Sequence, residues 1–104
     1  MNLATLKRNI KNGKEFKVVN HRIEHWIGQV RVPNKIQSNG VYTIAKGEPE
    51  HNISKANNGK GIWMEYGKAT EWEFYTDEQG IEHCVQYQGE HIKENLTIDF
   101  IFVE

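Results

Sequence analysis

Apolar residues recur at every second position through most of the chain, and this period constrains the fold more than any other feature. In the last segment, for example, Leu96, Ile98, Phe100 and Phe102 alternate with their neighbours. Successive side chains of a β-strand point to opposite faces of the sheet, so a period of two predicts strands. The alternating segments are short and separated by turn residues. They predict six or seven antiparallel strands between about residue 15 and residue 103.

Turn and breaker residues divide the predicted strands. Ser38-Asn39-Gly40 lies between two strand-like segments, and Asn-Gly is a strong hairpin signal because both residues tolerate positive φ. TDEQG, residues 76–80, predicts a second turn with its glycine in the left-handed region. Pro33 lacks an amide donor, so we expect it to end or edge the second strand, whose alternation starts at Trp26. The last strand is apolar on both faces, so we expect it to be central and covered on both sides.

The N-terminal segment has a helical period instead. Leu3, Leu6 and Ile10 share one helical face, Asn2 can cap the start, and Gly13 follows where a left-handed residue ends a helix. A helix over residues 3–12 is therefore predicted. The expected class is α+β, mainly β: this short helix with a strongly bent antiparallel sheet or a small SH3-like barrel. We expect residues 1–104 to form a single domain, with a long exposed loop over residues 46–61.

Cysteine content and apolar runs restrict the environment of the protein. Cys84 is the only cysteine, which excludes an internal disulfide and a thiolate zinc cluster within one chain. The N-terminal segment is interrupted by Lys7, Arg8 and Lys11, so we expect no export signal. The longest apolar run, residues 100–103, is too short to span a bilayer. We expect a cytoplasmic protein that does not enter a membrane and uses no cofactor.

Charge is divided unevenly along the chain, although the net charge is only −1. Residues 1–40 carry eight Lys or Arg and two Glu, a net charge of +6. Residues 41–104 carry five Lys and twelve Asp or Glu, a net charge of −7. This asymmetry is compatible with separate basic and acidic faces, and equally with two halves that attract each other within one fold.

The segment His21-Arg22-Ile23-Glu24-His25 matches the H-x-x-E-H pattern of a group of zinc peptidases. That chemistry needs a helix to place both histidines on one face, with the glutamate polarising a metal-bound water. Here the flanking residues have strand character, and Gly28 would break a helix directly after the second histidine. We interpret residues 21–25 as part of a turn between two strands and expect no catalytic residues.

The other histidines form a looser candidate for a metal site. No sequence spacing requires them to converge, but a fold could bring them together with an acidic neighbour. The residues in question are His51, His83 and His91 with Glu82 or Glu90.

Two candidate binding surfaces follow from the charged and aromatic residues. The first is basic and suits nucleic acid; it comprises Lys7, Arg8, Lys11, Lys17, Arg22, Arg31, Lys35 and Trp26. The second is acidic and suits docking on a basic groove of a protein; it comprises Trp63, Tyr66, Trp72, Glu71, Glu73, Asp77 and Glu78. The aromatic residues have an alternative interpretation, in which they fill the core of a small barrel.

Three segments carry a resemblance to a group of proteins: NGKEFKVVNHR, GQVRVPNKIQSNGVYTI and GKGIWMEYGKATEWEF. With their GxxFKVxNH, NKxQSNGxY and WxxYxKA patterns, they resemble the small uncharacterised proteins encoded by phages and mobile elements of Gram-positive bacteria. The resemblance implies a bacterial cytoplasmic protein that acts by binding. Its implied role is that of an accessory protein, or of an inhibitor of a host nucleic-acid-binding or defence protein. No catalytic residues come with it.

We therefore expect a non-enzymatic binding module. A protein partner is favoured, because a net charge near zero gives no long-range attraction towards nucleic acid. A nucleic-acid-binding accessory protein that uses the basic half is the alternative, and a small metal-dependent hydrolase is a third interpretation.

Overall fold

The computed structural model describes residues 1–48 and 62–104. These residues form one α-helix, two short 3-10 helices and seven strands. The helices are α1 (Leu3–Lys11), η1 (Glu24–Trp26) and η3 (Ile92–Glu94). The strands are β1 (Phe16–Asn20), β2 (Val30–Gln37), β3 (Gly40–Ala45), β4 (Ile62–Glu65), β5 (Thr70–Thr76), β6 (Glu82–Gln88) and β7 (Leu96–Phe102). The predicted class, mainly β with a short N-terminal helix, is confirmed.

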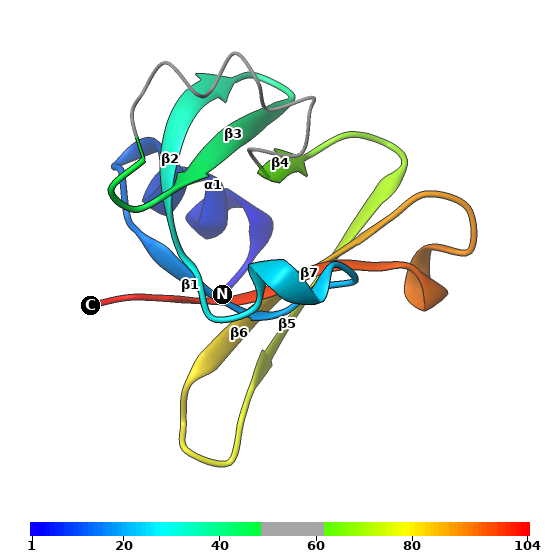
Figure 1. Ribbon diagram of the computed structural model, residues 1–104. Coiled ribbons are helices and arrows are strands. Elements are labelled where there is room, and N and C mark those ends of the chain that lie inside the picture. Colours follow the sequence, from blue (N-terminus) through cyan, green and yellow to red (C-terminus); the bar gives the residue numbers. More distant parts are fainter. Residues whose placement is uncertain (49–61) are drawn as a thin grey trace.

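All seven strands belong to one antiparallel sheet with the order β4-β3-β2-β1-β7-β6-β5. The sheet is so strongly bent that it is nearly closed into a barrel (Figure 1). Its two ends approach each other at Glu65, whose amide donates to Gln86 Oε1 at 3.0 Å. The carbonyl oxygen of Glu65 accepts from the indole nitrogen of Trp72 at 3.2 Å. Side chains thus bridge the first and last strands, and no ladder joins β4 to β5 in the described residues.

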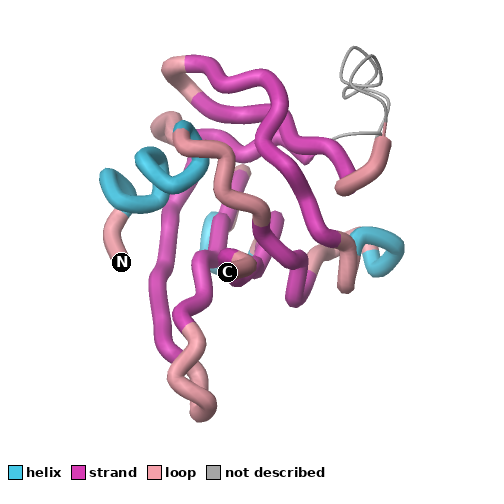
Figure 2. Tube along the Cα trace, turned by 90° about the vertical axis from the view of Figure 1, so that its left-hand side faces the viewer, coloured by secondary structure: helices cyan, strands magenta, loops and turns pink. Residues whose placement is uncertain are grey.

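Helix α1 begins and ends as its sequence predicts. Asn2 accepts a hydrogen bond from the amide of Thr5 at 2.9 Å and so caps the first turn. Gly13 follows the helix with a φ of +79° and donates to the carbonyl of Ile10 at 2.9 Å. Leu6 and Ile10 are fully buried in the core. The helix lies beside the bent sheet (Figure 2) and supplies part of the interior that the strands alone leave unfilled.

The core centres on β7, which pairs with β1 on one side and β6 on the other. Phe100 packs against Phe16 with ring centroids 4.4 Å apart and ring planes tilted by 43°, and Trp72 meets the Phe100 ring edge-on at 6.1 Å. The four consecutive residues 97–100 are all buried, so β7 is covered on both faces in its middle. The prediction of a central, doubly covered last strand is confirmed.

The β2–β3 hairpin forms where the sequence predicted it, but for a different reason. Gln37 pairs with Gly40, so Ser38 and Asn39 are the connecting residues. None of these residues has a positive φ, so the turn does not use the left-handed tolerance of Asn-Gly. Glycine is needed at position 40 because a Cβ there would lie 2.5 Å from the Trp63 ring on β4.

The second strand starts and ends later than predicted. Trp26 belongs to η1 and Gly28, with a φ of +89°, belongs to a turn, so β2 begins only at Val30. The strand then passes through Pro33 and continues to Gln37. The amide of Lys46 donates to the carbonyl of Val30, so the backbone groups of Val30 and Val32 face β3. Because these groups alternate along the strand, the nitrogen of Pro33 points away from β3. On that side β1 pairs only as far as Arg31, so Pro33 lies at a local edge and breaks no hydrogen bond.

Two further predictions concern connecting segments. The TDEQG turn joins β5 to β6, with Gly80 at a φ of +79° as predicted. The predicted loop over residues 46–61 lies almost entirely outside the described residues, between the end of β3 at Ala45 and the start of β4 at Ile62. In the described ranges no helix combines the length and apolar character needed to cross a membrane.

Candidate functional site

The β5–β6 hairpin projects from the body of the molecule (Figures 1 and 2). Its turn is held by Asp77, whose amide donates to the carbonyl of Ile81 at 2.9 Å. Asp77 Oδ1 also accepts from the amides of Gln79 and Ile81, at 2.8 and 3.0 Å. These bonds fix the turn that presents the end of the hairpin to solvent.

Strand β5 has two different faces because side chains alternate along it. Trp72 and Phe74 are half-buried and pack against the core. Glu71, Glu73 and Tyr75 therefore share the opposite, outer face, where Tyr75 is 40% exposed. The hairpin thus carries a polar, acidic face with one exposed aromatic ring.

The hairpin also has a one-sided charge. The range 70–88 contains no Lys or Arg, and its five carboxylates are Glu71, Glu73, Asp77, Glu78 and Glu82. Lys93 Nζ lies 3.1 Å from Glu71 Oε1, and the Met1 amino group lies 2.5 Å from Glu82 Oε2. Neither ion pair includes Glu73 or Glu78, although Lys93 also attracts Glu73, so the net charge of the outer face and of the tip stays negative.

One buried histidine ties the hairpin to β7. His83 is only 7% exposed; its Nδ1 lies 2.9 Å from Asp99 Oδ1 and its Nε2 lies 2.8 Å from Asp77 Oδ2. The hydroxyl of Tyr75 donates to Asp99 Oδ2 at 3.0 Å, and its ring stacks on His83 at 4.5 Å. Each ring nitrogen lies within hydrogen-bond distance of a carboxylate, an arrangement that favours the protonated imidazolium, and Nδ1 also lies 3.1 Å from the Tyr75 hydroxyl. His83 therefore links the turn of the hairpin at Asp77 to Asp99 on β7.

The pKa values of this cluster follow from the same contacts. Burial lowers the pKa of His83, but hydrogen bonds to Asp77 and Asp99 outweigh it, and the pKa is raised overall. The hydrogen bond from His83 is the main cause that lowers the pKa of Asp77. Burial, helped by the bond to Asp99, raises the pKa of Tyr75 to about 12. The raised pKa of His83 and the lowered pKa of Asp77 both favour an ion pair between these two side chains.

The H-x-x-E-H segment forms a turn, as interpreted from the sequence. Glu24, His25 and Trp26 make one 3-10 turn, so the two histidines do not share a helical face. His21 Nδ1 accepts a hydrogen bond from the amide of Ile23 at 2.9 Å, and its ring stacks on Trp26. The segment is used to close the connection between β1 and β2.

The described members of the looser histidine set do not come together either. His83 is held by two aspartates, whereas His91 is exposed and lies next to η3. His51 lies outside the described residues. Across residues 1–48 and 62–104, no group of three or more His, Cys, Asp or Glu is placed to hold a metal ion.

Two members of the predicted basic set are buried and are lost from it. Arg31 is 1% exposed and Trp26 is 6% exposed, with the guanidinium 4.6 Å above the indole ring. Arg31 donates to the carbonyl of Thr43 at 2.6 Å and to Gln29 Oε1 at 2.7 Å. Burial lowers the pKa of Arg31 to about 10. The predicted role in nucleic-acid contact is wrong for this pair, because neither side chain reaches the surface.

The other six basic residues are exposed but do not form one stripe. Lys7, Arg8 and Lys11 lie on the outer face of α1, with Lys7 Nζ 4.9 Å from the centre of the Tyr66 ring. Lys17 projects from the outer face of β1. Arg22 lies between β1 and η1, and Lys35 lies in the second half of β2. Only the α1 residues form a compact basic group.

The three aromatic residues of the predicted acidic set are only half-exposed. Trp63 packs on Tyr42 at 4.5 Å, and Trp72 bonds to Glu65 as described. Burial raises the pKa of Tyr66 to about 12. These rings largely serve the core, as the alternative interpretation held. The exposed aromatic residue among the acidic side chains is Tyr75, which the sequence did not single out.

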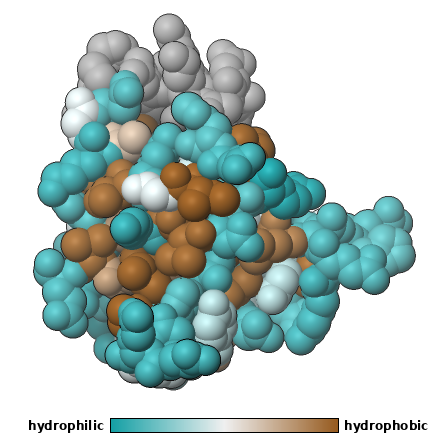
Figure 3. Space-filling model, turned by 60° about the horizontal axis from the view of Figure 1, so that its bottom comes forward, coloured by the Kyte–Doolittle hydropathy of each residue, from teal (hydrophilic) through white to brown (hydrophobic). Residues whose placement is uncertain are grey.

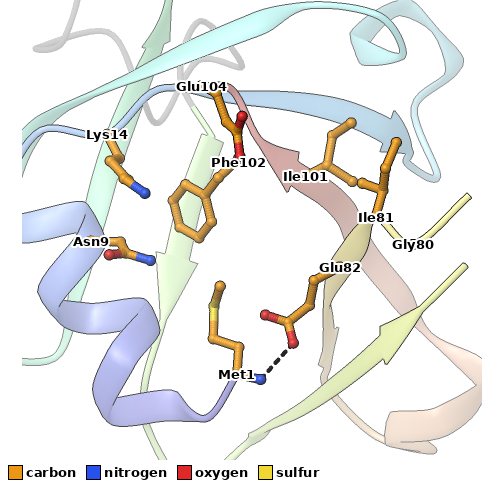
Figure 4. A pocket seen from close by; sticks show the side chains of 9 residues that line it. All are labelled: Met1, Asn9, Lys14, Gly80, Ile81, Glu82, Ile101, Phe102 and Glu104. Carbon is orange, nitrogen blue, oxygen red and sulfur yellow. Dashed lines mark hydrogen bonds and ion pairs between the residues drawn. The ribbon is translucent and has the colours of Figure 1, made fainter.

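Two other surface features lie outside both predicted sets. A hollow of about 490 Å³ beside the β5–β6 turn is lined by Phe102 and Ile101 and by charged groups of both signs (Figure 4). Figure 3 shows apolar side chains gathered in one area of the lower face and surrounded by hydrophilic ones. Exposed apolar side chains of the chain include Val19 on β1 and Ile23 and Ile27 beside η1.

No family model, no curated protein and no solved structure matches this chain. The resemblance to phage and mobile-element proteins consequently stays a prediction.

Proposed function

We propose that the protein is a non-enzymatic binding module of the phage or mobile-element kind, which docks on a basic surface of a protein partner through the acidic β5–β6 hairpin. The observation that carries this proposal is the projecting hairpin with five carboxylates and no Lys or Arg. In the wider proposal the module works in the cytoplasm, and its partner is a nucleic-acid-binding or defence protein of the host. A protein with a nucleic-acid-binding groove would offer the basic surface required.

Rigidity of the hairpin supports a role in binding. A docking element that is already ordered loses little conformational entropy on association. The tip is fixed by Asp77, and the stem is fixed to β7 through His83 and Asp99. Carboxylates on such a rigid support keep their spacing, which gives specificity as well as attraction.

The exposed ring of Tyr75 supports the same conclusion. Tyrosine is enriched at the centres of protein interfaces because a large, stiff, amphipathic side chain buries area at a small entropic cost. Tyr75 lies between Glu73 and Asp77 along the chain, stacked on His83 and 40% exposed. An anchor surrounded by carboxylates suits a partner with an aromatic or apolar site rimmed by Lys or Arg.

Affinity capture from cells in which the protein occurs tests the proposal when the bait is varied. Glu73→Lys and Glu78→Lys reverse charges on the hairpin, and Glu24→Lys is the matched control at an exposed position on η1. A partner protein should be retained by the wild type and the control after nuclease treatment. Each hairpin variant should bind it on the order of fivefold less tightly at low salt. Equal retention by all four baits would contradict docking through the hairpin.

Nucleic-acid binding through α1 is the second candidate, favoured by the exposure of Lys7, Arg8 and Lys11 on one helical face. A gel shift with labelled DNA or RNA separates the two functions. Binding that weakens steeply with salt and is lost in Lys7→Glu/Lys11→Glu would support this second function.

A further inference from the structure

Strand β5 is the last strand of the sheet and pairs on one side only, with β6. Hydrogen bonds just beyond its two ends set the ladder: Gly89 donates to the carbonyl of Ala69, and Asp77 donates to that of Ile81. Backbone groups in an antiparallel pair point alternately towards and away from the neighbour. The backbone groups of Glu71, Glu73 and Tyr75 therefore face β6, and those of Trp72, Phe74 and Thr76 point outwards.

These outward groups form an open edge. Thr70 uses its own outward amide to bond to the carbonyl of Gly67, and Trp72 uses its indole to reach Glu65. Beyond that point, no hydrogen bond joins the backbone of Trp72, Phe74 or Thr76 to another strand in the part of the chain that the structure describes. Among the described residues, the strand edge over positions 72–76 therefore has no neighbouring strand.

The edge lacks three common protections against pairing, namely short length, proline or lysine residues, and a bulge, and its charged residues are glutamates. Protected edge strands tend to be short or to contain proline, lysine or a bulge. Strand β4 at the other end of the sheet has only four residues. Strand β5 has seven, its sequence is TEWEFYT, and its pairing with β6 shows no shift in register.

Charge excludes a second copy of the chain as the natural occupant. Two β5 strands in antiparallel contact would bring the outer-face carboxylates Glu71 and Glu73 of both chains together, and like charges on neighbouring strands are destabilising. A basic strand would instead place its cations beside these residues. On the inner face its apolar side chains would lie beside Trp72 and Phe74, which already pack on the core.

We propose that β5 receives an extended segment of the partner, with basic and apolar residues in alternation, as an eighth strand of the sheet. This inference rests on the proposed function and adds the mode of docking. Main-chain hydrogen bonds to Trp72, Phe74 and Thr76 would supply affinity, and the carboxylates of Glu71 and Glu73 would select the partner.

The test uses the full chain and a peptide of alternating Lys and Val, about eight residues long with blocked ends. Two further peptides carry N-methyl groups, one on every Val and the other on every Lys. With Val facing inwards, antiparallel pairing directs the Val amides at β5, and parallel pairing directs the Lys amides there. One of the two N-methylated peptides should therefore bind at least about tenfold less tightly than the parent peptide, because several hydrogen bonds are lost together. The other should bind like the parent peptide.

Amide NMR of the protein locates the contact. The parent peptide should shift the signals of Trp72, Phe74 and Thr76 and slow their hydrogen exchange. Glu73→Gln should weaken binding about two- to fivefold, and Glu24→Gln should leave it unchanged. Thr76→Pro, which removes an outward amide donor without removing a bond to β6, should weaken it as well.

The outcomes separate strand addition from simple docking. If Glu73→Gln weakens binding but both N-methylated peptides bind as tightly as the parent peptide, docking through the acidic residues is supported and strand addition is refuted. If neither Glu73→Gln nor N-methylation matters, or the parent peptide does not bind at millimolar concentration, both are refuted for this edge. Concentration-dependent dimerisation that protects the same three amides would assign the edge to a second copy and overturn the proposal.

Discussion

Replacing His83 by glutamine should remove the cation that joins the β5–β6 hairpin to β7. His83 and Asp99 are 7% and 8% exposed, and their ion pair of 2.9 Å is screened little by solvent. A hydrogen bond to a charged group contributes about 1.5–3 kcal/mol, and the buried carboxylate left behind adds a desolvation cost. We expect His83→Gln to lower the free energy of unfolding by about 2–3 kcal/mol at pH 6. The bond to the more exposed Asp77 adds to this loss.

The effect should depend on pH in a defined direction. The pKa of His83 is raised above its value of 6.5 in the unfolded chain, so its contribution is fully present below pH 6.5. It is lost as the pH rises through the raised folded-state pKa. The pKa of Asp77 is lowered from 3.8, so its contribution is present above pH 3.8 and is lost in stronger acid. The difference between wild type and His83→Gln should be largest from about pH 4 to 6.5 and should shrink above that range.

Urea unfolding of both proteins at a series of pH values measures this difference. Subtracting the two curves cancels the contribution of other histidines to the pH dependence of stability. His21 is one of these: burial lowers its pKa, so its titration changes stability in the opposite sense. Parallel curves from pH 5 to pH 10, or a loss below about 0.5 kcal/mol at pH 6, would refute the assignment of His83 as a buried imidazolium.

Two further substitutions and one chemical modification test the packing. Arg31→Lys should lower the free energy of unfolding, measured by urea denaturation, by about 1–3 kcal/mol, because the buried guanidinium loses donors to Gln29 and Thr43. The exposed control Arg22→Lys should change it by less than about 0.5 kcal/mol. Equal effects of the two substitutions would contradict the burial of Arg31. Gly40→Ala should cost about 1–3 kcal/mol, since its Cβ meets the Trp63 ring, and an unchanged melting temperature would show that the strands separate easily there. Burial raises the pKa of the Cys84 thiol to about 12, so a thiol reagent at pH 8 should modify it only after urea unfolding, and rapid modification of the native protein would disprove its burial.

Local signals predicted the elements of this fold well. The helix with its caps at Asn2 and Gly13, and the turn that ends at Gly80, depend on residues a few positions apart. Where local signals failed, a contact from a distant strand decided the outcome. Trp26 continues the alternation of β2 in the sequence, yet it lies in a turn because its ring packs under Arg31 and beside His21.

The candidate site was predictable only in part for the same reason. The turn at residues 76–80 sets the register that places Tyr75 opposite His83, so this pair could have been found from the sequence once the turn was located. Asp99 could not, because its position beside His83 depends on β7 pairing with β6. Arg31 was expected at the surface because arginine is rarely buried unless paired; its acceptors on Gln29 and Thr43 become visible only once β2 and β3 are aligned.

The acidic residues of the hairpin therefore have two separate functions. Asp77 is bound by His83 and by the turn amides, so its charge is compensated and it shapes the tip. Glu73 and Glu78 are exposed and form no ion pair among the described residues, although Lys93, which pairs with Glu71, also attracts Glu73. The remaining repulsion between these carboxylates and Asp77 does not stabilise the isolated protein. The repulsion among these carboxylates on a rigid, projecting strand decreases only when a basic group approaches them. Under the proposed function, the same feature that makes the hairpin electrostatically unfavourable alone would favour a basic partner, and the edge of β5 lies directly beside it.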